Sequence, residues 1–452
     1  MAARFTTSEV CLALGLPTGK AIGGFSSVST DTRDLKPGAL FVALRGERFD
    51  GAEFVELSER LGAAGAVVSG GSDYAEVAFP VFTVPDTTAA LGDLARFHRR
   101  RCGARVVGVT GSSGKTTVKE MLAHAVGSEK RVHSTRGNLN NQVGLPLSIL
   151  AAEEETDVWV LELGSSEPGE IERLTAIAEP DDAVITTVGP AHLEGLGDVA
   201  GVLEEKLDLI RGASTAGCAV VGELPEVLPT RAREVRGDVV TAGLGPGSDF
   251  RPSDWHVGPE QARLRLAGVD YAVPVGGEHH LRDALIAAAT AKGLGVSPAG
   301  VARGLAEYRP VGLRGALIQV GKLTIVADCY NANPESFAAA IRYCSEGFPG
   351  RRLAAVVGSM LELGTAESAA HTEVAADLLR AGFTLVVALG AFQAAFQAMD
   401  LPEGVTVLYP STVQAAAEEL SERQRGDEVL LVKASRGMKL ERVIDSLTGG
   451  DA

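Results

Sequence analysis

The chain has few cysteines, no long apolar run and no excess of positive charge. Five cysteines are dispersed over 452 residues without any C-x-x-C pair, which argues against a zinc site and indicates reduced thiols, as in a cytoplasm. No apolar run approaches the roughly 20 residues that a membrane span needs. The first nine residues contain no apolar core of a secretory signal. These absences predict a cytoplasmic protein without membrane insertion.

Acidic residues dominate the charge of the chain. The 42 lysines and arginines are outnumbered by 58 aspartates and glutamates, which gives a net charge of −16. No basic surface is then available to displace the counterions of a nucleic acid, so nucleic-acid binding is not expected. The content of 45% hydrophobic residues and 54 glycines fits a soluble α/β protein. The length predicts about three domains, at roughly 100–200 residues each.

A glycine-rich turn directly behind an apolar strand is the strongest functional signal in the chain. Residues 106–109 are expected in a buried strand, and a helix is expected from Lys115 to about Val126. Such a turn directs backbone N–H groups and the positive helix end at one point, which suits phosphate. Lys115 adds a positive charge, and the Thr116 hydroxyl is placed to bind Mg²⁺ on the outer phosphates. The predicted nucleoside triphosphate site consists of Thr110, Gly111, Ser112, Ser113, Gly114, Lys115, Thr116 and Thr117.

The turn departs from the general pattern G-x-x-x-x-G-K-[ST] at one position. Val109 stands where the first glycine is usual. The alternative interpretation is a turn that only joins a strand to a helix. The Gly-Lys-Thr run behind the strand favours phosphate binding.

Changes of pattern divide the chain into three predicted domains, residues 1–85, 86–310 and 311–452. The first is a small α/β unit, and a helix over 87–101, whose basic end is expected to be solvated, leads into the nucleotide strand. Apolar strands that alternate with amphipathic helices predict a mostly parallel sheet in the second domain and another α/β unit in the third. The strands are expected at 104–109, 158–163, 183–188, 323–327, 353–358, 384–389, 405–408 and 428–433, with an inserted β region at 219–274 and a closing helix at 281–294.

Candidate metal ligands follow two of these strands. Glu162 ends one strand, and His192 follows the next in a loop. Ligands of open α/β sheets gather beyond the carboxyl ends of the strands, so both residues are expected beside the phosphate loop. This placement predicts a Mg²⁺ site, although a lone histidine in a loop is more often a solvated or structural side chain. Lys206, on a predicted helix, is by default an ordinary surface lysine.

At these positions the chain resembles the Mur ligases, which build the peptide of bacterial peptidoglycan. The run from Thr110 to Thr117 resembles their ATP loop. Within the family, further motifs are most similar to those of the ligases that add D-alanyl-D-alanine to UDP-N-acetylmuramoyl-tripeptide. These motifs follow in the expected order over nearly the whole chain, at residues 31–33, 41–51, 137–147, 189–195, 328–334, 360–364 and 432–439.

The resemblance implies both a fold and a reaction. The fold would comprise a small α/β uridine-nucleotide domain, a central ATPase domain of the phosphate-loop type and a C-terminal Rossmann-like domain. The reaction would be ATP-dependent amide ligation, in which the tripeptide carboxylate becomes an acyl phosphate that the dipeptide amine attacks. Because negative charge converges during this transfer, two Mg²⁺ ions and a lysine are expected to stabilise it.

The resemblance also assigns roles to individual residues. Lys115 would hold the outer phosphates, Thr116 and Glu162 the first Mg²⁺, and His192 the second. Lys206 stands where the family carries a carbamylated lysine, a carboxylate-like ligand for Mg²⁺. Further ATP contacts would come from Asp283, Arg314, Asp328, Tyr330 and Asn331. Substrate contacts would come from Thr32, Arg33, Arg45, Gly46 and Glu47 for the uridine nucleotide, from Asn138, Asn140 and Asn141, and from Lys433, Ser435 and Arg436 for the dipeptide. The three asparagines are equally well explained as a loop that satisfies its own backbone.

Several positions depart from the family pattern. Asp283 replaces an asparagine that would contact adenine, and an ionised aspartate can accept hydrogen bonds but cannot donate them. Adenine recognition is therefore expected to be looser or to use other groups. Ser359 replaces an aspartate, Ser166-Glu167 an Asn-His pair, and Ala52 a histidine. The metal and phosphate residues are intact, which favours sequence drift over loss of catalysis.

Three alternatives to this ligase stay open. A ligase for the third residue of the same precursor is a close relative, but the D-N-P-R motif of its meso-diaminopimelate form is missing from the sequence. Folate polyglutamating ligases share the loop but lack a uridine pocket like residues 21–51. A catalytically silent nucleotide-binding scaffold is motivated by Asp283 and Ser359. The favoured expectation is a monomeric ligase with ATP, Mg²⁺ and two small-molecule substrates.

Overall fold

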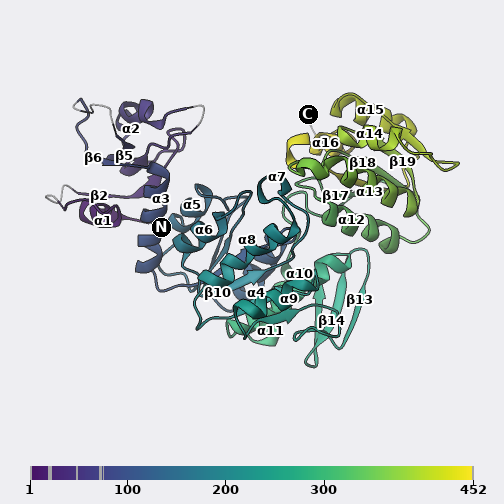
Figure 1. Cartoon of the computed structure of the whole chain (residues 1–452), viewed down its shortest axis with the longest axis horizontal. Helices are drawn as coiled ribbons and strands as arrows, with labels where there is room; N and C mark the ends of the chain where they lie inside the picture. Colours follow the sequence, from purple (N-terminus) through teal and green to yellow (C-terminus); the bar gives the residue numbers. More distant parts are fainter. Residues whose placement is uncertain (1–2, 19–22, 47–48, 71–73, 75, 450–452) are drawn as a thin grey trace.

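The computed structural model describes residues 3–18, 23–46, 49–70, 74 and 76–449 and contains three α/β domains in chain order. Figure 1 shows the N-terminal domain in purple and the C-terminal domain in green to yellow, on opposite sides of the middle domain. Within the described ranges, every helix is too short or too polar to cross a membrane.

The N-terminal domain is built on a small parallel sheet. Four strands pair in the order β3-β4-β5-β6, and β1 and β2 form a separate antiparallel pair. Successive side chains of β4 point to opposite faces, so Leu40 and Phe41 join different hydrophobic clusters. The elements are β1 (Phe5–Thr6), α1 (Thr7–Ala13), β2 (Gly24–Phe25), β3 (Ser27–Ser29), β4 (Ala39–Val42), η1 (Gly51–Phe54), α2 (Val55–Arg60), β5 (Gly65–Ser69) and β6 (Val81–Val84).

Helix α3 (Thr87–Arg101) joins the N-terminal and middle domains, and its bounds confirm the predicted helix. Its apolar residues belong to one continuous cluster with residues of both domains. The prediction of a solvated basic end holds only for Arg100, whose side chain is 62% exposed. The Arg99 side chain is 12% exposed and pairs with Asp181, whereas Arg101 pairs with Glu9. These pairs fix the helix between the two domains.

The middle domain contains a six-stranded parallel sheet in the order β12-β11-β10-β7-β9-β8. Helices α4, α10 and α11 pack on one face, and α5, α6, α8 and α9 on the other. Because the strands are parallel, the loops after β7, β9 and β10 meet at one edge. The elements are β7 (Arg105–Thr110), α4 (Lys115–Gly127), β8 (Val132–Ser134), α5 (Gly144–Leu150), β9 (Val158–Glu162), α6 (Glu170–Ala178), β10 (Asp182–Ile185), α7 (Leu193–Leu196), α8 (Val199–Gly212), β11 (Ala219–Gly222), α9 (Val227–Val235), β12 (Val240–Ala242), α10 (Glu278–Gly293) and α11 (Pro298–Glu307).

The predicted inserted β region is only partly correct. Residues 219–242 instead continue the parallel sheet as β11, α9 and β12. Pro225 and Pro229 obscured α9 in the sequence, but one precedes the helix and the other lies in its first turn, where proline is tolerated. The antiparallel insertion consists of β13 (Asp254–Val257), β14 (Ala262–Leu266) and β15 (Val269–Val273).

The C-terminal domain contains a second six-stranded sheet in the order β16-β17-β21-β18-β19-β20, with helices on both faces. All pairs are parallel except β16 with β17. The five predicted strands are confirmed to within one residue at each end, whereas the half-exposed edge strand β16 was not predicted. The elements are β16 (Ala316–Val320), β17 (Leu323–Ala327), α12 (Pro334–Gly347), β18 (Leu353–Val357), η2 (Gly364–Ala366), α13 (Glu367–Arg380), β19 (Phe383–Ala388), α14 (Ala391–Gln397), β20 (Thr406–Leu408), α15 (Val413–Arg423), β21 (Val429–Lys433), η3 (Arg436–Met438) and α16 (Glu441–Thr448).

Candidate active site

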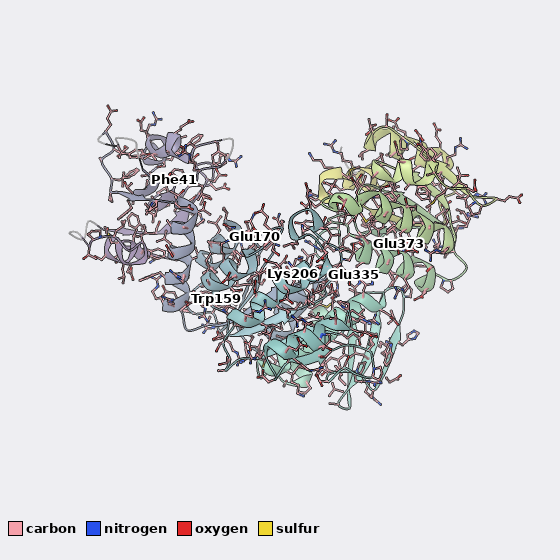
Figure 2. All side chains as sticks on the ribbon, viewed as in Figure 1. Phe41, Trp159, Glu170, Lys206, Glu335 and Glu373 are labelled. Carbon is pink, nitrogen blue, oxygen red and sulfur yellow. The ribbon has the colours of Figure 1, made fainter. Side chains whose placement is uncertain are left out.

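A cavity of about 920 Å³ lies where the middle and C-terminal domains meet. Loops after β7, β9 and β10 line it from the middle domain, and loops after β17, β18 and β21 line it from the C-terminal domain. Figure 2 shows Lys206 of the middle domain and Glu335 of the C-terminal domain near this junction. The predicted site residues that line the cavity are Ser112, Ser113, Gly114, Lys115, Thr116, Thr117, Asn138, Asn140, Asn141, Glu162, His192, Asp283, Arg314, Asp328, Tyr330, Asn331, Lys433, Ser435 and Arg436.

The phosphate loop contains two glycines at positions without room for a side chain. A Cβ on Gly111 would lie 2.0 Å from Thr186 Oγ1, and one on Gly114 would lie 2.5 Å from Asp283 Oδ1. Gly114 also has a φ of +78°, which glycine adopts readily. Helix α4 begins directly after it, so the unpaired N–H groups of its first turn lie at the cavity.

A lysine and a hydroxyl–carboxylate pair lie at the start of α4. Lys115 Nζ donates to Gly111 O at 2.6 Å, and burial lowers the pKa of Lys115 against the opposing effect of Glu162. Thr116 Oγ1 donates to Glu162 Oε2 at 2.8 Å, and Asn140 Nδ2 donates to Glu162 Oε1, also at 2.8 Å. Glu162 is 2% exposed. A buried carboxylate beside a hydroxyl provides the oxygen ligands that Mg²⁺ prefers.

His192 and Glu362 meet across the domain junction. Both are non-glycine residues with positive φ, +53° and +65° respectively. Such a conformation costs about 1–3 kcal/mol and persists only where the surroundings hold it. His192 Nδ1 lies 2.5 Å from Glu362 Oε2, and this hydrogen bond lowers the pKa of Glu362.

The predicted metal ligands do not form one closed cluster. Across the described ranges, no group of three or more His, Cys, Asp or Glu side chains could hold a metal ion. Thr116 and Glu162 are in contact, whereas His192 contacts Glu362 of the C-terminal domain and Lys206 contacts Ser165, three residues after Glu162. Mg²⁺ usually keeps several waters and needs one or two carboxylates plus phosphate oxygens. The open arrangement therefore fits Mg²⁺ bound together with a nucleotide.

Lys206 is not the surface lysine that its sequence context indicated. On α8 it is 1% exposed, and its Nζ donates to Ser165 Oγ at 2.6 Å. The neighbouring Glu205 carboxylate instead accepts from two backbone N–H groups at the start of α6, each at 2.7 Å. Burial, with a smaller contribution from Lys115, lowers the pKa of Lys206 to about 7. A large fraction of this amine is therefore neutral near neutral pH.

Asp283 lies against the phosphate loop. It is 6% exposed, and its Oδ1 lies beside Gly114. Burial, followed by the nearby Glu335, raises the pKa of Asp283 well above the usual range. Because a protonated carboxyl group donates as well as accepts, this position can still offer the donor that an asparagine would have.

The substitution Asp283→Asn is expected to remove a pH-dependent destabilisation. The native pKa of Asp283 exceeds the unfolded value of 3.8, so the folded state favours the protonated carboxyl group. The stability that Asp283 contributes is therefore complete below pH 3.8 and is lost as the pH rises through the native pKa. Each unit of elevation corresponds to about 1.4 kcal/mol. The melting temperature of the variant should therefore gain on that of the parent as the pH rises from the unfolded value of 3.8 towards the native pKa. Equal pH slopes in the two proteins would contradict a raised pKa.

The predicted C-terminal cations differ in burial. Lys433 is 1% exposed and pairs with Asp328 Oδ2 at 2.5 Å. The Arg314 guanidinium lies over the Tyr330 ring, with its Cζ 3.5 Å from the ring centroid. Arg436 lines the cavity and pairs with Glu441 Oε1 at 2.9 Å, but its side chain is 58% exposed. Arg314 and Arg436 are thus more accessible than Lys433 to an anionic ligand.

The predicted uridine-nucleotide residues belong to a different part of the molecule. The structure describes four of them, Thr32, Arg33, Arg45 and Gly46, all in the N-terminal domain, and none of these four lines the cavity. Glu47 lies outside the described residues. Arg33 pairs with Asp31 at 2.6 Å, and Arg45 with Asp50 at 3.6 Å.

Three further predicted residues lie next to the cavity without lining it. Thr110 and Gly111 precede the lining residue Ser112, and Lys206 donates a hydrogen bond to the lining residue Ser165.

The three asparagines have different surroundings, and only that of Asn141 matches a loop that satisfies its own backbone. Asn140 contacts the Glu162 carboxylate. Asn141 satisfies the local backbone, since its Oδ1 accepts from Gly144 N at 2.8 Å. Asn138 is exposed and lines the cavity.

An acidic group of the cavity was missed in the sequence. Glu335, in the first turn of α12, accepts from Thr187 Oγ1 at 3.3 Å, and burial raises its pKa. Asn333 caps the same helix and donates to Ser112 O at 3.4 Å. The available signal was a helix start shortly after the strand that ends at Ala327, because it places the first turn of α12 at the sheet edge.

The fold and the cavity define a three-domain α/β protein with a phosphate loop, and three family models match consecutive parts of the chain. The Mur ligase family catalytic domain matches residues 25–99, the Mur ligase middle domain residues 109–291, and the Mur ligase glutamate ligase domain residues 314–436. The chain belongs to the Mur ligase family.

Relatives and solved structures agree with this assignment. The UDP-N-acetylmuramoyl-tripeptide–D-alanyl-D-alanine ligase of Bacillus subtilis (strain 168) is 37% identical over 93% of this chain and 92% of its own length. The enzyme of that name from Escherichia coli (strain K12) is 35% identical over 93% of both. MurF from Acinetobacter baumannii has a TM-score of 0.88 at 29% identity over 99% of both chains. The MurF ligase from Thermotoga maritima in complex with ADP has a TM-score of 0.83 at 29% identity, over 94% of this chain and 97% of its own.

Proposed function

We propose that the chain is an ATP-dependent ligase that joins D-alanyl-D-alanine to UDP-N-acetylmuramoyl-tripeptide in peptidoglycan precursor synthesis. The observation that carries the proposal is the shared cavity, where the phosphate loop meets the cations of the C-terminal domain. Relatives named for this activity match nearly the whole chain. Fold alone does not imply function, so the proposal depends on the cavity and the relatives together.

The proposed reaction has two transfers at one place. The tripeptide carboxylate attacks the γ-phosphorus of ATP, ADP leaves, and an acyl phosphate forms. The dipeptide amine then attacks the acyl carbon, loses a proton, and the tetrahedral intermediate expels phosphate. Lys115 and Arg314 line the cavity and offset the negative charge that develops in both transfers.

Mg²⁺ fits the contact between Thr116 and Glu162. The hydroxyl and the carboxylate are both oxygen donors, and Asn140 holds the second carboxylate oxygen. Bound Mg²⁺ compensates the charge of the phosphate oxygens. We assign a second ion to His192, with Lys206 in carbamylated form as an anionic partner.

Carbamylation of Lys206 is supported by its surroundings. A neutral amine attacks CO₂, forms an N–C bond and releases one proton, which leaves an anionic carbamate. The pKa of about 7 gives Lys206 the neutral form that this step needs. The nearest acidic neighbour in sequence, Glu205, is occupied by backbone N–H groups and does not pair with the amine.

The substrates are assigned to separate surfaces. ATP is placed along the phosphate loop, with Asp283, Asp328, Tyr330 and Asn331 nearby. The uridine nucleotide is assigned to the N-terminal domain, where the exposed Arg33 and Arg45 suit phosphate oxygens. The dipeptide carboxylate is assigned to Arg436, because its side chain is 58% exposed at the cavity whereas that of Lys433 is 1% exposed.

The three domains of the chain are proposed to comprise residues 1–85, 86–310 and 311–452. A monomer is proposed to be the active form. A cytoplasmic location is proposed because the five cysteines are free thiols.

Phosphate release should require both UDP-N-acetylmuramoyl-tripeptide and D-alanyl-D-alanine. The purified chain is assayed with ATP and Mg²⁺ in a coupled assay, and each substrate is omitted in turn. Sustained release is expected only in the complete mixture, together with the pentapeptide nucleotide by mass spectrometry. ATP binding without turnover would indicate a silent scaffold. Turnover with a dipeptide nucleotide and a diamino acid would indicate the third-residue ligase.

The change at Ser359 gives no support to a silent scaffold. Its Oγ accepts from Ala391 N at 2.9 Å, at the start of α14. Ser359 is not among the residues that line the cavity in the described structure. A serine in place of the family's aspartate at position 359 therefore leaves the phosphate loop and the cavity cations unchanged.

A further inference from the structure

The contact between His192 and Glu362 joins two domains at a single imidazole. His192 precedes α7 of the middle domain, and Glu362 lies in the loop after β18 of the C-terminal domain. His192 Nδ1 and Glu362 Oε2 are 2.5 Å apart. The two residues are 170 positions apart in the chain, so the contact exists only when the domains are seated against each other.

The backbone on both sides is shaped for this contact. His192 and Glu362 are two of five described non-glycine residues with positive φ. Glu194 N donates to Glu362 O at 3.2 Å. Gly364 lies close to the same residue, since a Cβ added to Gly364 would lie 3.4 Å from Glu194 Cα. An isolated exposed ion pair contributes little to stability. Here, two unusual backbone conformations and a backbone hydrogen bond indicate that the surrounding structure maintains the contact.

The hydrogen bond determines which imidazole nitrogen is available. The Glu362 carboxylate can only accept, so of the two neutral tautomers the contact selects the one with the proton on Nδ1 and the lone pair on Nε2. The ring lines the cavity and is about one-fifth exposed, at 22%. Within the described part of the chain, Nε2 has no hydrogen-bond partner. This is the tautomer that a ligand-binding histidine needs, with a carboxylate on its other nitrogen.

We propose that Glu362 is a positioning residue: it fixes the Nδ1–H tautomer and the orientation of His192, and it does so only while the C-terminal domain is seated. The inference rests on the proposed function for the identity of the ligand at Nε2, a divalent cation. Domain placement and metal-ligand orientation are thereby coupled through one hydrogen bond. Glu362 itself contacts neither cation nor substrate in this role.

Histidine tautomers in the full chain test the proposal directly. Long-range ¹H–¹⁵N spectra of ¹⁵N-histidine-labelled protein are recorded for the parent, Glu362→Ala and Glu362→Gln, with His192→Gln used to assign the signal. The parent is expected to show the Nδ1–H form. Glu362→Ala should lose it, and Glu362→Gln should keep it, because the amide oxygen still accepts. Glu373→Ala is the control, an exposed glutamate on α13 of the same domain (Figure 2).

Cation binding provides a second measurement. Mn²⁺ is titrated by electron paramagnetic resonance in the presence of a non-hydrolysable ATP analogue. Glu362→Ala is expected to weaken binding about 10-fold, within the roughly 10–100-fold range for lost partners of metal-binding histidines. Glu362→Gln and Glu373→Ala should differ from the parent by less than about twofold. In a His192→Ala background, Glu362→Ala should have no further effect.

The outcomes separate this inference from the proposed function. An unchanged tautomer in Glu362→Ala, or an equal loss in Glu373→Ala, would overturn the positioning role. So would a Glu362→Ala effect on Mn²⁺ that persists without His192. If the tautomer depends on Glu362 but the complete substrate mixture releases no phosphate, the positioning role stands and the ligase assignment fails.

Discussion

Lys115→Ala is expected to lower product formation by at least about 10³-fold while leaving the fold intact. Lys115 lies at the phosphate loop, where its charge is available to the outer phosphates of ATP. Removing one preorganised group that stabilises developing charge typically costs about 10²–10³ in rate, and Lys115 carries a full charge. Initial rates in the phosphate-release assay and thermal melting curves are the two measurements.

The control for this variant is Lys130→Ala, just beyond the far end of α4. It removes the same charge from the same part of the chain, away from the cavity, and should retain parental rates. A Lys115→Ala protein with near-parental turnover would show that the loop does not bind the reacting phosphates. A large fall in melting temperature would instead make the loss structural.

Lys206→Ala is expected to reduce turnover by at least about 100-fold. In the proposed carbamate form, Lys206 would supply an anionic oxygen beside the proposed cation site, and alanine would remove it. The side chain is 1% exposed, so a structural cost is also expected and melting curves are needed alongside the rates. Lys322→Ala, at an exposed position between β16 and β17, is the control and should retain parental rates.

Chemical rescue distinguishes a lost carboxylate from a lost amine in Lys206→Ala. Acetate or formate should partly restore turnover, because either can occupy the vacated position with a carboxylate. Rescue by a small amine, but not by acetate, would point to an unmodified lysine. A normal rate for Lys206→Ala at limiting bicarbonate would remove the carbamate from the mechanism.

The parts of the site that follow from local sequence were predictable. The predicted phosphate loop is one short segment, so its glycines, lysine and threonine could be located from the local sequence. Its helix was expected to end within one residue of its observed end at Gly127. Glu162 could be placed at the same edge because parallel strands end together.

Features that depend on packing between distant segments were not predictable. The sequence around Lys206 is rich in acidic residues and typical of a surface, and only the packing of α8 against the sheet shows that the lysine is buried. Asp283 is a conspicuous substitution, but its low exposure depends on the phosphate loop lying against it. Glu362 acquires a partner 170 positions away, for which the sequence has no local signal.

The distribution of apolar contacts has a mechanical consequence. The cluster that includes α3 extends through both the N-terminal and the middle domain, whereas the described clusters of the C-terminal domain draw on that domain alone. Pulling the first two domains apart would expose apolar surface to water. The C-terminal domain meets the middle domain through hydrogen bonds, such as those of Glu335 and Asn333, which water can replace at little cost, and through the ring contact of Tyr343 with His279. Three domains should therefore move as two bodies, with a hinge near residues 309–315.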